Sequence, residues 1–412
     1  MGDFTAARIT KGSVMRHVPL REPGQGNDSH GPARGRRWQS TLMVSVAAAG
    51  LAAAVVPAGA AAAAPNAAVP NSFRQTNLVA NTSSRHPSLV DKNLKNAWGI
   101  TAGPSTPIWV SDNNSGKATV YTGGVNGSKV SLALTVKVPG GNPTGQVFNP
   151  SKAFPVGGAS GMPAVFIVDS DSIGSTQSPG LIAAWNGGSK FTTEASPTGG
   201  PGGKTPAGAV FKGLAIAAST KAGPELFAAD VANASVDVFN GKFASVSTPT
   251  EFKDPKLPAG YAPFGIQNLG NKIYVTYGKQ NASKTDVVPG AGRGVVDVYS
   301  VNGMLLHHLV SNGPSSPLNE PWGLAIAPKG FGPFGGDLLV GNLGNGWINA
   351  FNPTTGKFLG TLDDSTGYPV TIPGLWGLMV GNSAFGGPSS VVFSAGPNGY
   401  NNGVLGTLNP AG

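Results

Sequence analysis

A short motif, in which a mostly aromatic residue precedes glycine and an apolar run, recurs six times and restricts the fold of this 412-residue chain more than any other feature. The copies are "NAWGI" (96–100), "PTGQV" (143–147), "FKGLA" (211–215), "PFGIQ" (263–267), "PWGLA" (321–325) and "LWGLM" (375–379). Their glycines are separated by 46, 68, 52, 58 and 54 residues, slightly more than the roughly 40–50 residues of common propeller blades. Unequal steps of this kind indicate one repeated unit with surface loops of variable length.

Each copy is followed by an apolar strand that ends at a polar residue, a turn rich in Gly and Asn, and an alternating strand. Examples are "IWVSDNNSGKATVY", "LFAADVANASVDVF" and "LLVGNLGNGWINAF". Gly accounts for 62 of 412 residues, about twice the usual 7%, and long amphipathic helical patterns are missing. With one further short strand per unit, the sequence predicts an all-β fold, a six-bladed β-propeller of four-stranded blades.

The two ends of such a ring must meet. After the sixth repeat only "GTLNPAG" (406–412) remains, whereas the strand-like "SFRQTNLVANTSS" (72–84) precedes the first repeat without a partner. We therefore expect this N-terminal strand to complete the last blade and to remove an exposed sheet edge. We expect the repeated glycine to let the innermost strands approach closely, and its aromatic neighbour to be a packing residue that wedges between neighbouring blades.

The first seventy residues have the pattern of an export signal. A basic stretch ending in "RGRRWQS" (34–40) runs into the uncharged "TLMVSVAAAGLAAAVVPAGAAAAAP", which predicts a signal peptide cleaved near Ala60 or Ala64. A retained membrane anchor is the less favoured alternative, because the apolar run is shorter than the roughly 20 residues that a spanning helix requires. The predicted organisation is a signal peptide and small-residue linker at 1–70 and a secreted, extracellular propeller domain at 71–412.

Charge and cysteine content exclude several classes of function. Without residues 1–70 the chain keeps 21 Lys+Arg and 16 Asp+Glu, a net charge of +5 with no basic cluster, so we expect no nucleic-acid partner. The chain has no Cys, which excludes disulfides, a lipid-modified Cys, thiolate metal sites and a Cys nucleophile. We expect a monomer without a stable membrane anchor after cleavage.

Strand alternation places the start of each innermost strand and the end of each second strand on the same face of the ring. Loops that follow the second strands of the second, fourth and sixth units are long and should overhang this mouth of the channel. The ligand-binding candidates at the mouth are the acids and amide Asp112, Asp169, Asp171, Asp230 and Asn342 and the aromatic residues Trp98, Trp322 and Trp376.

Two interpretations of the polar candidates remain open. Their oxygens are suited to Ca²⁺, the one metal the sequence suggests, or to polar contacts with a ligand. Alternatively, each side chain accepts backbone N–H groups of its own turn. The recurrence of these residues at the same blade position favours this structural role. Asp171 lies in a long irregular loop, so we expect it to be exposed. Because it breaks the repeat, it is also the most informative candidate for a ligand site.

No catalytic residue is predicted. The stretch "TGGPGGKT" (198–205) has Thr198 where a phosphate loop needs its first Gly, and no helical pattern follows it. After residue 70 the only His residues are His86, His307 and His308, and alternation sends the last two to opposite faces of a strand. A His-based triad or a His-rich metal site is therefore not favoured.

Several stretches resemble known propeller sequences. "LFAADVANASVDVF" and "LLVGNLGNGWINAFNPTTG" resemble NHL repeats, and "FRQTNLVANTS", "LKNAWGI", "PTGQVFN" and "EPWGLAIAP" resemble a family of uncharacterised secreted bacterial propeller proteins, some of which carry a PEP-CTERM sorting tail. The resemblance covers about residues 72–410, with Ala97 where Pro is more usual and no sorting tail. It implies a fold and secretion, and no established activity.

The sequence supports two functions. We expect a binding or scaffold module for an unknown extracellular ligand or protein at one mouth of the channel. The alternative is a metal-dependent hydrolase or lyase of the lactonase-like propeller type, which would need acids that converge on one another or on a metal.

Overall fold

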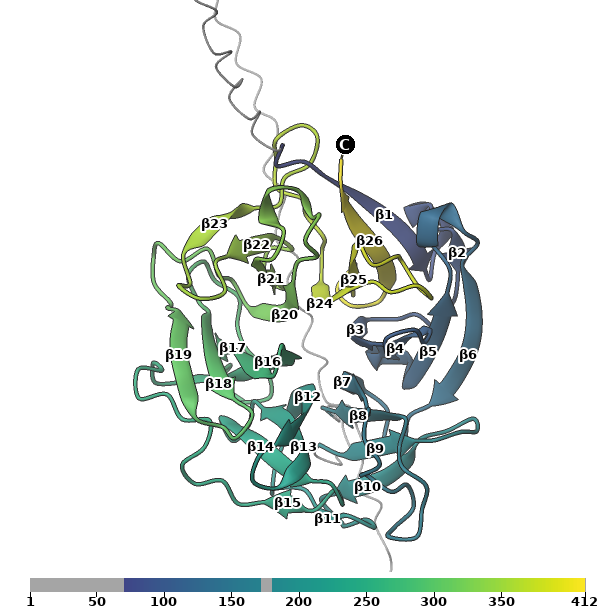
Figure 1. The fold of residues 1–412 in the computed structure, drawn as a ribbon, viewed down its shortest axis with the longest axis vertical. Coiled ribbons are helices and arrows are strands. Elements are labelled where there is room, and N and C mark those ends of the chain that lie inside the picture. The colour runs from purple at the N-terminus through teal and green to yellow at the C-terminus, as the bar shows by residue number, and fades with distance from the viewer. Residues whose placement is uncertain (1–69, 172–179, 412) are drawn as a thin grey trace, which may run out of the picture. The chain divides into compact units, whose positions relative to one another are not determined.

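Six β-sheets surround a central axis like the blades of a propeller (Figure 1). The structure is a computed structural model and describes residues 70–171 and 180–411. The six-bladed, all-β fold predicted from the repeat is confirmed. The predicted signal segment lies outside the described residues, and within the described residues no helix is long and apolar enough to cross a membrane.

Four blades have four antiparallel strands, ordered from the axis outward. Blade 1 contains β3 (Ala97–Thr101), β4 (Ile108–Asp112), β5 (Lys117–Thr122) and β6 (Ser131–Lys137). Blade 3 contains β12 (Phe211–Ser219), β13 (Gly223–Asp230), β14 (Ser235–Asn240) and β15 (Ser245–Val246). Blade 4 contains β16 (Tyr261–Leu269), β17 (Lys272–Lys279), β18 (Val295–Ser300) and β19 (Leu305–Val310). Blade 5 contains β20 (Pro321–Ile326), β21 (Leu338–Asn342), β22 (Ile348–Phe351) and β23 (Phe358–Thr361).

The other two blades each carry a fifth, two-residue strand that runs parallel to its neighbour. Blade 2 contains β7 (Pro143–Phe148), β8 (Phe166–Ser170), β9 (Ile182–Trp185), β10 (Thr192–Ser196) and β11 (Gly203–Lys204). Blade 6 contains β24 (Leu375–Val380), β25 (Val391–Ala395), β26 (Val404–Pro410), β1 (Phe73–Ala80) and β2 (Leu89–Val90). Short 3₁₀ turns are η1 (Ser83–Arg85), η2 (Asn113–Ser115), η3 (Val125–Gly127) and η4 (Gly332–Phe334).

The N-terminal strand closes the ring, as the sequence predicts. Strand β1 pairs antiparallel with β26, from Phe73 opposite Pro410 to Ala80 opposite Val404. It therefore occupies the fourth position of blade 6, where it covers the edge of β26 that would otherwise be unpaired.

The repeated glycines lie where innermost strands of neighbouring blades meet. A Cβ atom on Gly377 would lie 2.9 Å from the Trp98 carbonyl oxygen of the next blade, and one on Gly213 would lie 3.2 Å from the Phe264 oxygen. At the other four repeat glycines the added atom would lie closer still to the next backbone. Any side chain here would push neighbouring blades apart, which explains why each blade keeps a glycine at this position.

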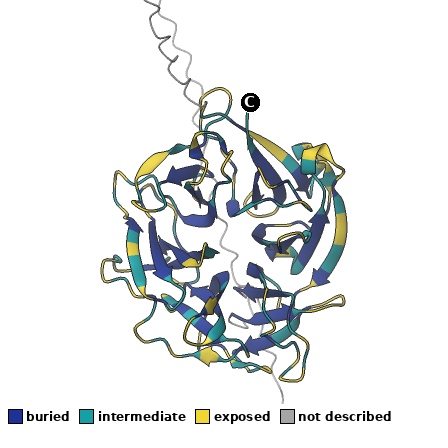
Figure 2. Cartoon of the chain, viewed as in Figure 1, coloured by how far each residue is buried: buried dark blue, intermediate teal, exposed yellow. Residues whose placement is uncertain are grey.

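Apolar side chains fill the space between the blades. In the described part of the chain, each pair of neighbouring blades shares one cluster of buried apolar residues; the cluster between blades 3 and 4, for example, includes Phe227 and Tyr277. Figure 2 shows that the inner strands are buried, whereas exposed residues gather on the outermost strands and loops. Residues of the inner strands of all six blades line a small cavity of about 20 Å³.

Candidate functional site

Aromatic residues from four blades pack together at one mouth of the channel. Trp98 of blade 1 stacks on Trp376 of blade 6 with ring centroids 3.6 Å apart, and Trp322 of blade 5 lies edge-on to Trp376 at 5.9 Å. Phe264 of blade 4 lies 6.0 Å from Trp376. All four side chains are buried. We call this group, Trp98, Phe264, Trp322 and Trp376, the aromatic plug.

Hydrogen bonds tie the aromatic plug to distant parts of the ring. The indole N–H of Trp322 donates to the carbonyl oxygen of Lys212, which belongs to blade 3, over 2.9 Å. The indole N–H of Trp376 donates to Asn96 Oδ1 over 3.0 Å. The expectation of packing residues is confirmed by their burial, but their place is corrected: Trp322 reaches across the channel mouth and does not wedge only between adjacent blades.

A lysine occupies the blade 3 position that holds an aromatic residue in four other blades. Lys212 is fully buried, and its Nζ lies 3.2 Å from Asp171 Oδ2 and 3.4 Å from Asp286 Oδ2. The ammonium also lies 5.2 Å from the ring centre of Trp98, a cation–π contact. Burial disfavours the charged ammonium, but the carboxylates of Asp171 and Asp286 outweigh burial and raise the pKa of Lys212. Sequence reasoning missed this residue, although its place in "FKGLA" was the signal.

Glu320 is a second charged group beside the plug. It precedes β20, is 6% exposed and has a left-handed backbone with φ 54°, which is uncommon for a residue other than glycine. Its carboxyl accepts no hydrogen bond and forms no ion pair with any residue that the structure describes. Burial, and to a lesser extent the Asp286 carboxylate, raises the pKa of Glu320 to about 8. Glu320 is therefore a buried acid without a partner in the described chain.

Tyr400 and Asp286 form the solvent-facing rim of the mouth. Tyr400 is 41% exposed and lies 5.9 Å from the Trp376 ring, and the Asp286 side chain is 42% exposed. Burial of its hydroxyl end, with the nearby Glu320 and Asp286 carboxylates, raises the pKa of Tyr400. These groups and Lys212 thus share one electrostatic environment, which we call the mouth cluster: Asp171, Lys212, Asp286, Glu320 and Tyr400.

Asp230 caps its own turn, whereas Asn342 bonds to a distant part of the chain. Asp230 Oδ1 accepts the backbone N–H groups of Val210, Ala232 and Asn233 at 3.0, 2.9 and 3.2 Å. The amide of Asn342 donates to the Pro317 carbonyl oxygen at 2.9 Å. Both residues are fully buried. The contacts of Asp230 support the structural interpretation of that side chain, whereas Asn342 Oδ1 accepts no hydrogen bond within the described residues.

Asp112 and Asp169 are also internal. Burial, with a smaller contribution from nearby Asp91, raises the pKa of Asp112 well above its usual value, which favours the neutral acid. Asp169 Oδ1 lies 2.8 Å from the Thr144 hydroxyl, and burial raises the pKa of Asp169 to about 7. Neither carboxyl faces solvent at the mouth.

Asp171 is the predicted candidate that the structure places in the mouth cluster, but not as an exposed residue. It is 5% exposed and pairs with buried Lys212. The expectation of a solvent-exposed loop residue was wrong, because a buried ammonium on the neighbouring blade draws the carboxylate inward.

Away from the channel mouth, the described residues include three side chains whose ligand atoms lie close enough together to hold a metal ion. Asp254, Asp297 and His308 bring their ligand atoms within 4.8 Å of one another. Asp297 and His308 lie on the two outer strands of blade 4, β18 and β19, away from the aromatic plug.

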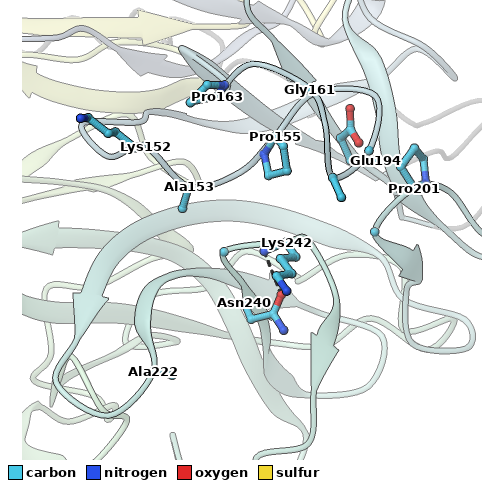
Figure 3. Close-up of a pocket in the computed structure, with 14 residues that line it drawn as sticks. Lys152, Ala153, Pro155, Gly161, Pro163, Glu194, Pro201, Ala222, Asn240 and Lys242 are labelled. Carbon is cyan, nitrogen blue, oxygen red and sulfur yellow. Dashed lines mark hydrogen bonds between the residues drawn. The ribbon is translucent and has the colours of Figure 1, made fainter.

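A separate groove of about 660 Å³ lies between the outer parts of blades 2 and 3. Figure 3 shows the segment that carries Ala153 and Pro155 on one side and the turn with Asn240 and Lys242 on the other. Glu194, a fully buried residue of its wall, accepts the Gly157 N–H at 2.8 Å. Among the described residues, the charged side chains that line this groove form no ion-pair network like that of the mouth cluster.

Comparisons with known proteins give the chain relatives but no function. No protein-family model matches the chain. It is 34% identical over 176 residues to the uncharacterised protein R648 and 33% identical over 206 residues to the uncharacterised protein L690, both of Acanthamoeba polyphaga mimivirus. These matches cover 41% and 48% of this chain and 41% and 51% of the relatives. The chain thus spans about half the length of the curated relatives it matches, and these relatives are viral, not bacterial.

Some solved structures with a similar fold are enzymes. The soluble aldose sugar dehydrogenase of Escherichia coli is 12% identical with a TM-score of 0.48 and covers 82% of this chain and 100% of its own. A virginiamycin B lyase from Staphylococcus aureus is 10% identical with a TM-score of 0.45 and covers 82% and 98%. Similarity at this level carries no argument about the chemistry of the present chain.

Proposed function

We propose that this chain is a secreted ligand-binding propeller whose site is the mouth cluster, and that its ligand carries a positively charged group. The observation that carries the proposal is Glu320, a buried carboxyl that has no partner among the described residues and is held in a left-handed backbone conformation. Such backbone conformations are costly and concentrate at functional sites. The Glu320 carboxyl oxygens are not among the fully enclosed atoms that lack a hydrogen bond, so solvent reaches them, and a bound cation would supply the partner that the described residues do not.

The charge balance of the mouth cluster supports a cationic ligand. It contains three carboxyl groups but one ammonium, and Lys212 contacts only Asp171 and Asp286 among these acids. The partly exposed Tyr400 adds an aromatic surface beside Glu320, and aromatic faces attract organic cations. Secretion is proposed on the signal pattern of residues 1–70.

A metal-dependent hydrolase or lyase at this mouth has less support. The Lys212 ammonium lies within 3.4 Å of both Asp171 and Asp286, so it already supplies the positive charge that a Ca²⁺ ion between these carboxylates would supply. Among the described residues, the mouth acids do not form a set of three converging ligands. A lactone and phosphoester activity panel tests the alternative; turnover that Glu320→Gln abolishes would favour an enzyme over a binding module.

Binding of a cation should release a proton. With a pKa of about 8, Glu320 is mostly protonated at pH 7, and a nearby positive charge favours the carboxylate. Isothermal titration with choline and putrescine, in two buffers of different ionisation enthalpy, measures affinity and proton release together. We expect at least about tenfold weaker binding and no proton release in Glu320→Gln, as for loss of one charged hydrogen bond.

A matched control is Glu251→Gln, the same chemical change in the connection between blades 3 and 4, far from the mouth cluster in the chain. It should bind like the parent protein. The proposal fails if neither probe binds the parent, or if the two variants bind equally.

A further inference from the structure

Three side chains with metal-ligand chemistry meet on the outer part of blade 4. Asp254 lies in the connection between β15 and β16, Asp297 on β18 and His308 on β19. His308 Nδ1 lies 2.7 Å from Asp254 Oδ2 and 3.0 Å from Asp297 Oδ1. Residues 54 positions apart in the chain therefore bring one nitrogen and two oxygens to a single point.

A single proton on His308 Nδ1 satisfies this arrangement only in part. One ring nitrogen carries at most one hydrogen, yet His308 Nδ1 faces oxygens of two carboxylates. Asp297 is fully buried, and its Oδ1 accepts no hydrogen bond within the described residues. A buried carboxylate oxygen without a hydrogen bond, aimed at a histidine nitrogen and a second carboxylate, is the environment that a bound cation relieves.

The opposite atom of each of the three side chains is held by another contact. Asp254 Oδ1 accepts the Lys256 backbone N–H at 2.9 Å, and Asp297 Oδ2 accepts the Tyr299 hydroxyl at 3.2 Å. His308 Nε2 lies 2.9 Å from the Ser311 hydroxyl. Metal ligands in proteins are oriented by outer contacts of this kind, and here these contacts direct the inner atoms of the three side chains toward one another.

We propose that Asp254, Asp297 and His308 bind one divalent transition-metal ion of the zinc class. An imidazole nitrogen with two carboxylate oxygens suits zinc and its neighbours, whereas Ca²⁺ requires six to eight oxygen ligands. This site differs from the Ca²⁺ site considered at the channel mouth in its residues, its place and its metal. A bound ion would fasten the connection between blades 3 and 4 to the two outer strands of blade 4.

The test uses the full-length protein, freed of metal with EDTA and dialysed. Titration with ZnCl₂ by calorimetry should show one equivalent bound, and Co²⁺ should give visible absorption bands of a site with a nitrogen ligand. Zinc should also raise the melting temperature, because it binds the folded state in preference to the unfolded chain. His308→Gln should weaken zinc binding by about 100-fold or more, since even outer-contact changes cost 10- to 100-fold.

The neighbouring residue provides the control. His307 lies on the same strand but is exposed on the other face, so His307→Gln should keep the zinc affinity of the parent. Asp297→Asn provides a second loss of a ligand in case His308→Gln does not fold, as judged by circular dichroism. An ion-pair network without a metal is indicated, and the proposal overturned, if the parent binds no zinc or if His308→Gln and Asp297→Asn bind it as the parent does.

Discussion

Glu320 should make the protein less stable as the pH rises, and Glu320→Gln should remove this effect. The folded pKa of about 8 lies above the ordinary value of 4.5, so between these values the folded state keeps a proton that the unfolded chain has lost. Stability rises with pH only where the unfolded state binds more protons. The sign is the opposite here, and the Glu320 contribution to stability is lost as the pH rises from about 4.5 to about 8.

The magnitude follows from the two pKa values. Their difference, at about 1.4 kcal/mol per pKa unit, sets an upper limit of about 5 kcal/mol at pH 9. Glutamine has the shape of the protonated acid and does not ionise, so parent and Glu320→Gln should have nearly equal stability at pH 4.5. The advantage of the variant should grow across the window and reach about 1–5 kcal/mol above pH 8, on the same scale.

Urea unfolding at pH 4.5, 6, 7, 8 and 9 measures this difference. Asp169 and Asp237, each with a pKa raised to about 7 chiefly by burial, lower stability over part of the same window. They do so in parent and variant alike, so the difference between the two proteins isolates Glu320. Parallel stability curves for parent and Glu320→Gln would refute the reasoning, whereas Glu251→Gln should run parallel to the parent.

Three further substitutions and one control test the packing of the ring, each by thermal or urea unfolding. Trp322→Ala should cost about 3–5 kcal/mol, as for other buried aromatic residues; a parent-like melt would mean that the plug is an exposed platform. Asp171→Asn should cost about 1–3 kcal/mol, because buried Lys212 keeps only one carboxylate partner; a loss below about 0.5 kcal/mol would restore the surface interpretation. Gly265→Ala places a Cβ 2.9 Å from Thr276 Oγ1 and against the Trp322 backbone, and it should cost more than about 2 kcal/mol of stability. The control Gly330→Ala, whose Cβ would have nothing within 4 Å, should be neutral or slightly stabilising. Equal effects of the two substitutions would contradict the crowding argument.

The sequence predicted the architecture because its cause is local and repeated. Each blade needs a glycine where its inner strand touches the next, so Gly99, Gly213 and Gly377 mark blades directly in the sequence. The role of the N-terminal strand was predictable because the sixth repeat lacks a fourth strand of its own and the N-terminal strand lacks a partner. The structural role of Asp230 was also within reach, since a residue repeated at one blade position is explained by the turn beside it.

The charged groups were harder to predict because their partners come from different blades. Lys212 stands inside the glycine motif "FKGLA", and nothing near it in the sequence shows that Asp171 and Asp286 approach it. Alternation correctly separated His307 from His308 but gave no information about Asp254, which reaches His308 from the preceding connection. Such contacts depend on how neighbouring blades pack. The spacing of a repeat along the sequence does not tell which side chains of two blades come close to each other.

The pairing of β1 with β26 has a consequence for how the protein is made. The two strands are separated by more than 300 residues, so the last blade stays incomplete until the ribosome has finished the final strand. Until then β1 and β25 keep open edges that other chains can pair with. Closure over so long a loop makes folding slow. A truncation after residue 403 should leave the sequence of five blades intact and yet prevent the ring from closing.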